Sequence, residues 1–485
     1  MTSQRDRASV LVTGATGYVG GRLWRKLQEA AVHVRCMARD PLSLAYKVSD
    51  TTEVVRADIF SVSSLEAALE GIETAYYLIH SMGSAGNFED ADREGARNFV
   101  QAAERAGVKR IIYLGGLGDP SEELSPHLRS RHEVGEILRS TKVAVLELRA
   151  SIVLGAGSLS FEMIRALVDR LPVMITPRWV EVEAQPIGID DLLSYLIEAI
   201  TVPLPESRVF EIGGPDRLSY GQLMNEYAAI KGLRRFMIRV PVLTPRLSSL
   251  WLGLVTPLYA RIGKKLIESI VHPTVVQDQS ALEAFKVRPI TIKEAVTRGI
   301  EEEQRQAAQT RWSDAVSSGG ESKDWTGASF GKRLQYCRCV SVRTDPTRAF
   351  RPIQKIGGTE GWYACNWLWA LRGFLDILIG GVGVRRGRTH PVNIGVGDTL
   401  DFWRVEAFEQ DKRLLLRAEM KLPGKAWLEF IVEESEEGCI IRQTASFDPV
   451  GWMGTAYWHL VSPLHGIVFS GMLRSIADRS MQTSA

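Results

Sequence analysis

The stretch Ser9-Val-Leu-Val-Thr-Gly14-Ala-Thr-Gly17-Tyr-Val-Gly20-Gly-Arg-Leu23 joins an apolar run, a glycine-rich turn and the start of a helical pattern. Amide groups in the first turn of a helix have no acceptor inside it, and the helix dipole adds partial positive charge there. Strand, tight turn and helix in this order predict a site for the phosphates of a dinucleotide. The residues assigned to this site are Gly14, Thr16, Gly17, Tyr18, Val19 and Gly20. The alternative is an ordinary glycine turn.

The three glycines have separate expected roles. Gly14 suits a left-handed turn, Gly17 allows the backbone to approach a pyrophosphate, and Gly20 allows the helix to pack closely on the strand. Val32 to Ala38 is the second expected strand, and Arg39 ends it where an acidic residue would bind the ribose of NAD. An arginine there suits a 2′-phosphate, so NADP is favoured. The adjacent Asp40 keeps NAD as an alternative.

Two further strands are expected at Glu53 to Ala57 and Ala75 to Ile79. Asp58 and Ile59 follow the first, and we assign them to the adenine side, with a capping or turn aspartate as the alternative for Asp58. His80 follows the second strand. Ligands bind at the carboxyl ends of strands in open α/β sheets, so His80 is assigned to the cofactor site.

Strands alternate with helices through the first half of the chain. The last two predicted strands are Arg110 to Leu114 and Val143 to Leu148, and their apolar runs are typical of strands buried on both faces. The predicted class is α/β, with a doubly wound parallel sheet and a smaller substrate-side portion over residues 158–300.

The order of several motifs resembles an extended or atypical short-chain dehydrogenase/reductase over residues 8–300. The resemblance implies NAD(P) bound by the glycine turn, with Asp58 near adenine and Arg39 near the adenosine ribose. The motifs are Thr13-Gly-Ala-Thr-Gly-Tyr-Val-Gly20, Asp58-Ile59, Ile111-Ile-Tyr-Leu-Gly-Gly, Leu148-Arg-Ala, Gln185-Pro-Ile and Phe210-Glu-Ile-Gly-Gly-Pro.

The catalytic residues of that family are replaced here. Active members carry a serine after the fifth strand and Tyr-x-x-x-Lys at the following helix, where this chain has Leu114-Gly-Gly and His127-Leu-Arg-Ser-Arg131. By position, His127 stands for the tyrosine and Arg131 for the lysine. Histidine is a general acid near neutral pH, and a guanidinium can hold an oxyanion or a ribose. Three interpretations stay open: altered hydride-transfer chemistry, coenzyme binding without turnover, and an ordinary charged helix face.

Length and composition indicate two domains and give no signal for nucleic-acid binding. The chain has 485 residues, with 59 Lys plus Arg against 57 Asp plus Glu, which gives no argument for nucleic acid. The domains are expected at 1–304 and 331–485, with a polar linker at 305–330. The five cysteines are scattered, so reduced thiols in a cytoplasmic protein are expected, and no metal site is predicted.

One apolar segment offers a contact with membranes. Leu247 to Ile262 is apolar and is followed by Lys264 and Lys265, a combination that also occurs in helices bound to a membrane surface. A lid helix over the substrate pocket is the favoured alternative. A peripheral membrane location is the second expectation beside the cytoplasm.

The second half changes character, because tryptophan and other aromatic residues concentrate in it. A strand, a helix from Trp362 to Ile379 interrupted at Gly373, an antiparallel meander with turns at Gly424 and Gly438, and a closing helix from Met453 to Ala477 are expected. This order resembles the START-like helix-grip superfamily. Further motifs, among them Gly361-Trp-Tyr and Asp401-Phe-Trp-Arg404, resemble an uncharacterised domain fused to reductase-like proteins.

The resemblance implies an apolar cavity for a small hydrophobic ligand, and aromatic residues that only fill the core are the alternative. Arg385, Arg386 and Arg388 are candidates to meet an anionic group of that ligand, with a solvated basic loop as the favoured alternative. The function expected for the whole chain is an NADP-dependent oxidoreductase of a hydrophobic carbonyl or quinone-like molecule. The alternative is a catalytically silent NADP(H) sensor or assembly protein. Oligomeric state and substrate identity have no signal in the sequence.

Overall fold

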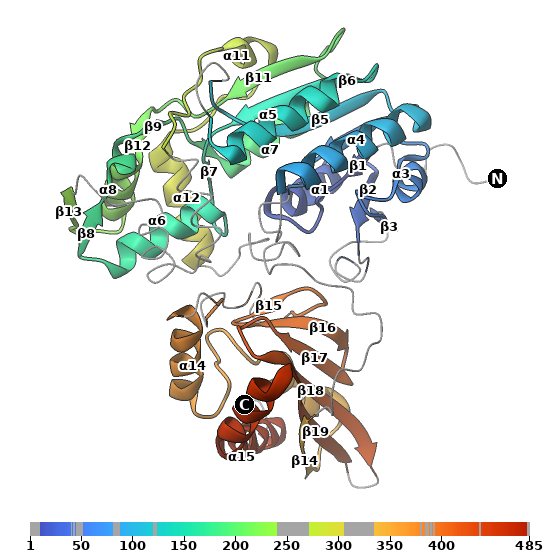
Figure 1. The fold of residues 1–485 in the computed structure, drawn as a ribbon, viewed down its shortest axis with the longest axis vertical. Coiled ribbons are helices and arrows are strands. Elements are labelled where there is room, and N and C mark those ends of the chain that lie inside the picture. Colours follow the sequence, from blue (N-terminus) through green and yellow to red (C-terminus); the bar gives the residue numbers. More distant parts are fainter. Residues whose placement is uncertain are drawn as a thin grey trace. The chain divides into compact units, whose positions relative to one another are not determined.

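The chain forms two compact units, Met1–Glu321 and Ser322–Ala485 (Figure 1). The computed structural model describes residues 10–39, 52–80, 88–119, 124–239, 271–304, 334–378, 381–383, 393–435 and 438–482, with Pro41, Leu44, Arg388 and His390. The predicted linker, the apolar segment 247–265, Asp40, Arg385 and Arg386 lie outside these residues. The predicted domain boundaries remain predictions.

The first unit contains a seven-stranded sheet in the order β11-β6-β5-β4-β1-β2-β3. Every neighbouring pair is parallel, and the crossover between β1 and β4 is the point where the strand order reverses. The predicted parallel sheet is confirmed, and the sheet gains one strand, β11, that was not predicted as part of it. The strands are β1 Val10–Val12, β2 Val34–Ala38, β3 Thr52–Arg56, β4 Thr74–Tyr77, β5 Arg110–Gly116, β6 Ala144–Ala150 and β11 Arg208–Ile212.

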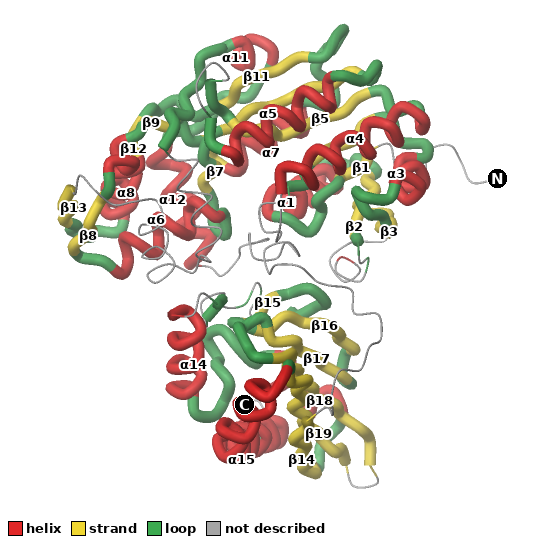
Figure 2. Tube along the Cα trace, viewed as in Figure 1, coloured by secondary structure: helices red, strands yellow, loops and turns green. Residues whose placement is uncertain are grey.

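Helices cover both faces of this sheet, because successive strand residues are apolar and point to opposite sides. Val10 and Val12 pack with α1 and α7, whereas Leu11 between them packs in a second core with α3 and α4. Figure 2 shows these helices on either side of the strands. The helices are α1 Tyr18–Glu29, α7 Ile189–Glu198, α3 Val62–Leu69, α4 Phe88–Ala106 and α5 Pro126–Arg139.

A charged residue lies in the core between α5 and the sheet. Glu147 of β6 is fully buried, and it pairs with Arg139 of α5 and with Arg149, whose Nε lies 2.6 Å from its Oε1. A Cβ atom on Gly135 would lie 2.8 Å from Glu147 Cδ, so the helix approaches the carboxylate more closely than any side chain allows. Removing one partner of a buried ion pair leaves an uncompensated charge, so this cluster fixes α5 on the sheet.

The substrate-side portion has its own core. One stripe of α6, formed by Phe161, Ile164, Leu167 and Val168, is buried in it. The elements of this portion and its connections are β7 Val153–Leu154, α6 Leu159–Arg170, β8 Val173–Thr176, η1 Arg178–Glu181, β9 Glu183–Ala184, β10 Ile187–Gly188, β12 Leu218–Ser219, α8 Tyr220–Ile230, β13 Phe236–Arg239, α11 Ser280–Ala284 and α12 Ile292–Gln304.

The second unit contains a separate six-stranded antiparallel sheet in the order β14-β19-β18-β17-β16-β15. The first strand of this unit pairs with its last strand, and the long helix α15 packs along both. The predicted antiparallel meander is confirmed. The elements are β14 Leu334–Val342, α13 Pro346–Gln354, α14 Asn366–Leu378, β15 Thr399–Leu400, β16 Trp403–Glu409, β17 Arg413–Ala418, β18 Gly424–Ser435, β19 Gly438–Pro449 and α15 Gly451–Met481.

Two local predictions for this unit are wrong. Helix α14 continues through Gly373, which is buried where the chain around Gly383 packs against it. Gly424 begins β18 instead of marking a turn, and it faces Pro449 across the sheet, where a side chain would meet the Asp448 carbonyl. At Gly424, close packing and not a change of chain direction requires the glycine.

None of the helices in the described part of the chain is both long enough and apolar enough to cross a membrane.

We expect Gly135→Ala to lower the free energy of unfolding of the first unit by about 1–3 kcal/mol, because the new methyl group must displace a fully buried, paired carboxylate. Helix propensity alone predicts the opposite sign, a gain of about 1 kcal/mol. Urea unfolding followed by circular dichroism measures the difference. Gly466→Ala in α15 is the matched control, because its Cβ atom would make an ordinary contact, 3.8 Å from the Tyr336 hydroxyl.

Candidate coenzyme and reaction site

The glycine turn brings α1 very close to the end of β1. Gly14 has φ +64°, and a Cβ atom there would lie 2.7 Å from the Leu78 carbonyl oxygen. A Cβ atom on Gly20 would lie 2.8 Å from the carbonyl carbon of Gly14. Gly14 is therefore required by backbone conformation and by space, and Gly20 by space alone.

Gly17 is different, because it faces the region where a phosphate would bind. It is the N-cap residue of α1, and its N–H donates to the Gly14 carbonyl over 2.8 Å. A Cβ atom built on it meets one described atom, the Gly14 oxygen at 3.2 Å. The open side of Gly17 and the first-turn amides of Val19 and Gly20 form a cradle that fits a pyrophosphate.

Thr13 fastens this turn to the neighbouring strand. Its hydroxyl donates to the Tyr76 carbonyl over 2.8 Å and accepts the Leu78 N–H over 2.9 Å. Thr13 lies within the glycine-rich sequence motif, but the sequence pattern alone assigns it no role. Its bonds join the carboxyl ends of β1 and β4, the crossover at which doubly wound sheets bind their ligands.

The side chain of Tyr18 packs into the protein interior. Arg22 lies over its ring at 5.1 Å, and burial raises the pKa of its hydroxyl. Arg22 in turn donates to the Ala156 carbonyl and pairs with Glu302 of α12 at 2.7 Å. Tyr18 can therefore reach a phosphate through its backbone amide, while its side chain helps to join α1 to the substrate-side portion. Thr16 and Val19 are half-buried beside it.

The residues predicted for the adenine side lie at the ends of β2 and β3. Arg39 directly follows β2 and is exposed, as a contact with a 2′-phosphate requires. Asp58 follows β3, and its Oδ1 accepts the Phe60 N–H over 3.0 Å. One carboxylate oxygen of Asp58 therefore stabilises the local turn, as the alternative interpretation of this residue expects. Ile59 is buried against α4, where Gly95 makes room for it.

His80 and His127 meet at the carboxyl edge of the sheet. Their ring centroids are 4.7 Å apart, although one residue follows β4 and the other lies in the first turn of α5. His80 Nδ1 lies 3.3 Å from a carboxylate oxygen of Asp92, and the Ser130 hydroxyl donates to the same oxygen over 3.1 Å. Asp92 is only 5% exposed.

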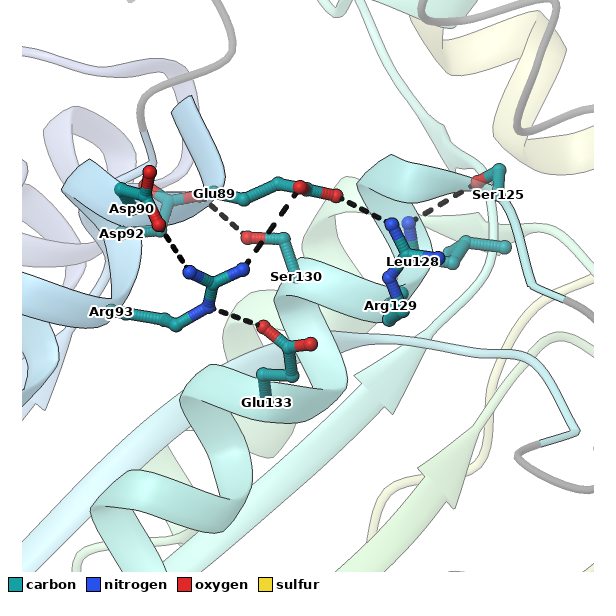
Figure 3. A network of polar contacts seen from close by, with 9 residues as sticks. All are labelled: Glu89, Asp90, Asp92, Arg93, Ser125, Leu128, Arg129, Ser130 and Glu133. Carbon is teal, nitrogen blue, oxygen red and sulfur yellow. Dashed lines mark hydrogen bonds and ion pairs between the residues drawn. The ribbon is translucent and has the colours of Figure 1, made fainter. Parts of the chain in front are cut away.

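Asp92 and Ser130 were not predicted as site residues. The sequence pattern of α4 does not show that Asp92 is buried, because helical periodicity alone does not distinguish a buried aspartate from one at the surface. Figure 3 shows both within a network between α4 and α5. Asp92 thereby places a carboxylate beside the His80 imidazole.

The charged residues at the start of α5 do not form one solvated face. Arg129 pairs with Glu89 at 2.9 Å, and Glu133 pairs with Arg93 at 2.8 Å, so both attach α5 to α4 (Figure 3). Arg131 instead turns toward the sheet, where it donates to the Leu114 carbonyl and covers the Tyr113 ring at 5.3 Å.

His132 is part of the fold. It is 6% exposed, and its Nε2 lies 3.1 Å from the Gly116 carbonyl oxygen. Burial lowers its pKa to about 4, so it is neutral at pH 7. Arg131 and His132 thus both lie against the end of β5, where active short-chain dehydrogenases carry their serine.

One edge of the sheet thus holds the glycine cradle, the exposed Arg39 and the His80–His127 pair. The strands run parallel, so the residues that follow β3, β2, β1, β4 and β5 lie in that spatial order along the edge. A dinucleotide lying along this edge would place its reactive end near His80 and His127. Among the described residues, His, Cys, Asp and Glu form no cluster of three able to hold a metal ion.

Two family models match separate parts of the chain. One, described as NAD(P)H-binding, matches residues 14–153, and the other, Protein of unknown function (DUF2867), matches residues 331–472. The first covers the turn, the histidine pair and Arg131. The second covers the antiparallel sheet and most of α15.

Curated relatives match the coenzyme-binding part. Ceramide reductase of Caulobacter vibrioides is 26% identical over 241 residues, which are 48% of this chain and 74% of that protein. Cinnamoyl-CoA reductase 1 of Oryza sativa subsp. japonica is 28% identical over 120 residues, or 23% of this chain. 3-beta-hydroxysteroid dehydrogenase of Mycolicibacterium neoaurum is 34% identical over 122 residues, also 23%. The chain spans 36% and 33% of the length of these last two relatives.

A solved structure shows the same fold. The triphenylmethane reductase of Citrobacter sp., complexed with NADP(H), aligns with a TM-score of 0.50 and 20% identity over 60% of this chain and 99% of its own. The first unit therefore contains an NAD(P)-binding Rossmann domain of the short-chain dehydrogenase/epimerase type, and the second unit contains a DUF2867 domain.

Proposed function

We propose that the protein is an NADP-dependent reductase of a hydrophobic carbonyl or quinone-like compound. The observation that carries the proposal is the contact between His80 and His127 at 4.7 Å, on the same edge of the sheet as the glycine cradle. A proton donor and a coenzyme phosphate site at one edge are what carbonyl reduction requires. The relatives matched here include two named reductases and a dehydrogenase, so the alternative of a silent coenzyme sensor is not favoured.

The residues divide the work of such a reaction. Bound NADPH would supply a hydride to the carbonyl carbon of the substrate. His127 would give a proton to the carbonyl oxygen, so that the product is an alcohol. His80, oriented by Asp92, would stabilise the proton on the imidazole pair. Arg131, with its permanent charge, would hold the nicotinamide ribose or the developing oxyanion.

The preference for NADP over NAD rests on Arg39. We expect Arg39→Ser to weaken NADPH binding about tenfold, because an exposed charge-assisted contact contributes on the order of 1.4 kcal/mol, and to leave NADH binding unchanged. Calorimetric titration of both coenzymes measures the ratio. Arg105→Ser on α4 is the control, because Arg105 is equally exposed but lies at the far end of its helix. Equal losses for the two coenzymes would remove Arg39 from the 2′-phosphate site.

Proton donation by His127 has a kinetic signature. We expect His127→Gln to lower kcat for quinone or carbonyl reduction by at least about 100-fold, the usual contribution of a general acid, while NADPH affinity stays within about twofold. The assay is NADPH oxidation monitored against a panel of quinones and hydrophobic ketones. His33→Gln, at an exposed histidine, should leave the rate unchanged. Full activity in the His127 variant would remove this residue from the mechanism.

We also propose that the second unit is a helix-grip domain that receives a small hydrophobic ligand. The long helix α15 lies against an antiparallel sheet whose inner face is apolar, which supports this assignment. For the basic loop that is proposed to contact an anionic group of the ligand, the structure describes one of the three arginines, Arg388. Arg388 donates to the Ile356 and His390 carbonyls, so backbone oxygens occupy part of its guanidinium.

A peripheral membrane contact is a second proposal, and one face of α14 supports it. Trp367, Leu371, Phe374, Leu375 and Leu378 recur at helical spacing and are 47–67% exposed. A helix with a tryptophan-containing apolar stripe of this kind is typical of binding in the plane of a membrane surface.

We expect wild-type protein to float with phosphatidylcholine–phosphatidylglycerol vesicles, and Leu371→Glu with Phe374→Glu to reduce the floating fraction at least about fivefold, because two charges would enter the apolar boundary. Phe60→Glu with Leu282→Glu, at exposed apolar residues of the first unit, is the matched control. Flotation that the α14 variant leaves unchanged would reject this face as the contact.

A further inference from the structure

The inner face of the second unit is apolar except at a few polar side chains. Along β19 the buried residues alternate as Cys439, Ile441, Gln443, Ala445 and Phe447, and Gln443 is 2% exposed. A buried amide in such a row costs free energy unless all its groups are hydrogen-bonded.

A second polar side chain lies in the apolar stripe of α15 that faces the sheet. His465 lies one turn before the buried Phe469, and their ring centroids are 5.1 Å apart. Met472 continues this stripe and contacts Gln443, whose Nε2 lies 3.5 Å from its Sδ. The polar groups of helix and sheet therefore belong to one interior region.

Four buried polar atoms in this region have no hydrogen-bond partner among the residues that the structure describes. They are Trp369 Nε1, Trp403 Nε1, Gln443 Oε1 and His465 Nδ1. Indole N–H groups can only donate, and an amide oxygen can only accept. A native interior rarely leaves several such groups unsatisfied, and a bound water or ligand is the usual explanation.

Ring contacts connect the two indoles. Trp369 of α14 and Trp403 of β16 both contact Trp362 and Phe402, with centroid distances between 5.3 and 6.1 Å. On its other side, Trp369 contacts Phe469 at 6.2 Å and so reaches the His465 side of the cluster.

Trp369 and Trp403 thus belong to one aromatic cluster with Trp362 and Phe402. Gln443 lies on β19, which β18 and β17 separate from β16, and His465 joins the cluster through Phe469. Burial lowers the pKa of His465 to about 4, so this ring is uncharged at neutral pH.

We propose that the aromatic cluster of Trp362, Trp369, Phe402 and Trp403 binds a flat conjugated molecule that carries at least two carbonyl-type acceptors. The indole N–H groups of Trp369 and Trp403 would donate to these acceptors, and the surrounding rings would stack on the apolar body. The inference deepens the proposed function, on which it rests for the class of substrate, by placing recognition of that substrate in the second unit.

The test compares two probes of equal shape on the full chain, without coenzyme. 2,3-Dimethyl-1,4-naphthoquinone carries two carbonyl acceptors and cannot readily add cysteine thiols at the methylated positions, and 2,3-dimethylnaphthalene lacks both oxygens. We expect calorimetric titration to give at least about tenfold tighter binding of the quinone. Trp369→Phe and Trp403→Phe should each reduce that ratio about fivefold to tenfold, the value of one hydrogen bond in affinity.

Trp367→Phe is the matched control, because Trp367 lies on the same helix but is 67% exposed, and it should leave the ratio unchanged. Since a merely packed indole would change the affinity of both probes equally, the ratio separates recognition from structural damage. Equal affinity for the two probes, no binding of the quinone, or a ratio insensitive to both buried variants would overturn the proposal. NADPH oxidation assayed separately reports on the reductase proposal, so a protein that prefers the quinone but does not reduce it would refute only the latter.

Discussion

The approach of α1 to the end of β1 is the constraint on which the first unit depends. A side chain at position 20 would penetrate the Gly14 peptide, and one at position 14 would collide with the Leu78 carbonyl. The same closeness aims the first-turn amides of α1 at the outer edge of the sheet, where they can bind an anion. Thr13 then ties the end of β1 to β4, so the phosphate cradle and the segment leading to His80 are positioned together. The glycine turn therefore both allows α1 to pack closely on β1 and forms the predicted phosphate site.

The reaction end of the edge is organised by α4 and α5. Arg93 and Arg129 join the two helices through carboxylates, while Asp92 connects α4 to both Ser130 and His80. Helix α5, whose first turn carries His127, is also held on the sheet by the buried Glu147 cluster. Where the family resemblance implies a tyrosine and a lysine, this helix carries His127 and Arg131.

The sequence was sufficient to predict those features that follow from a local pattern of residues. Alternating strands and helices implied a parallel sheet, and the glycine spacing implied the turn. It failed where meaning depends on residues far apart in the chain. The His80–His127 contact, the burial of Asp92 and the close packing at Gly373 and Gly424 arise only when separate elements meet. The role of Thr13 was visible only once β4 was known to lie beside β1. The orphaned indoles of the second unit likewise have no signature in composition, because aromatic residues in a core look the same with or without a ligand.

The buried Glu147 also has a consequence for how this chain can diverge. Its carboxylate fills the space that a side chain at position 135 would occupy, and its charge is balanced by arginines at 139 and 149. No single replacement among these four positions keeps both the close packing and the pairing of Glu147. Related chains should therefore change them jointly, for instance to an alanine facing an uncharged strand residue without arginines.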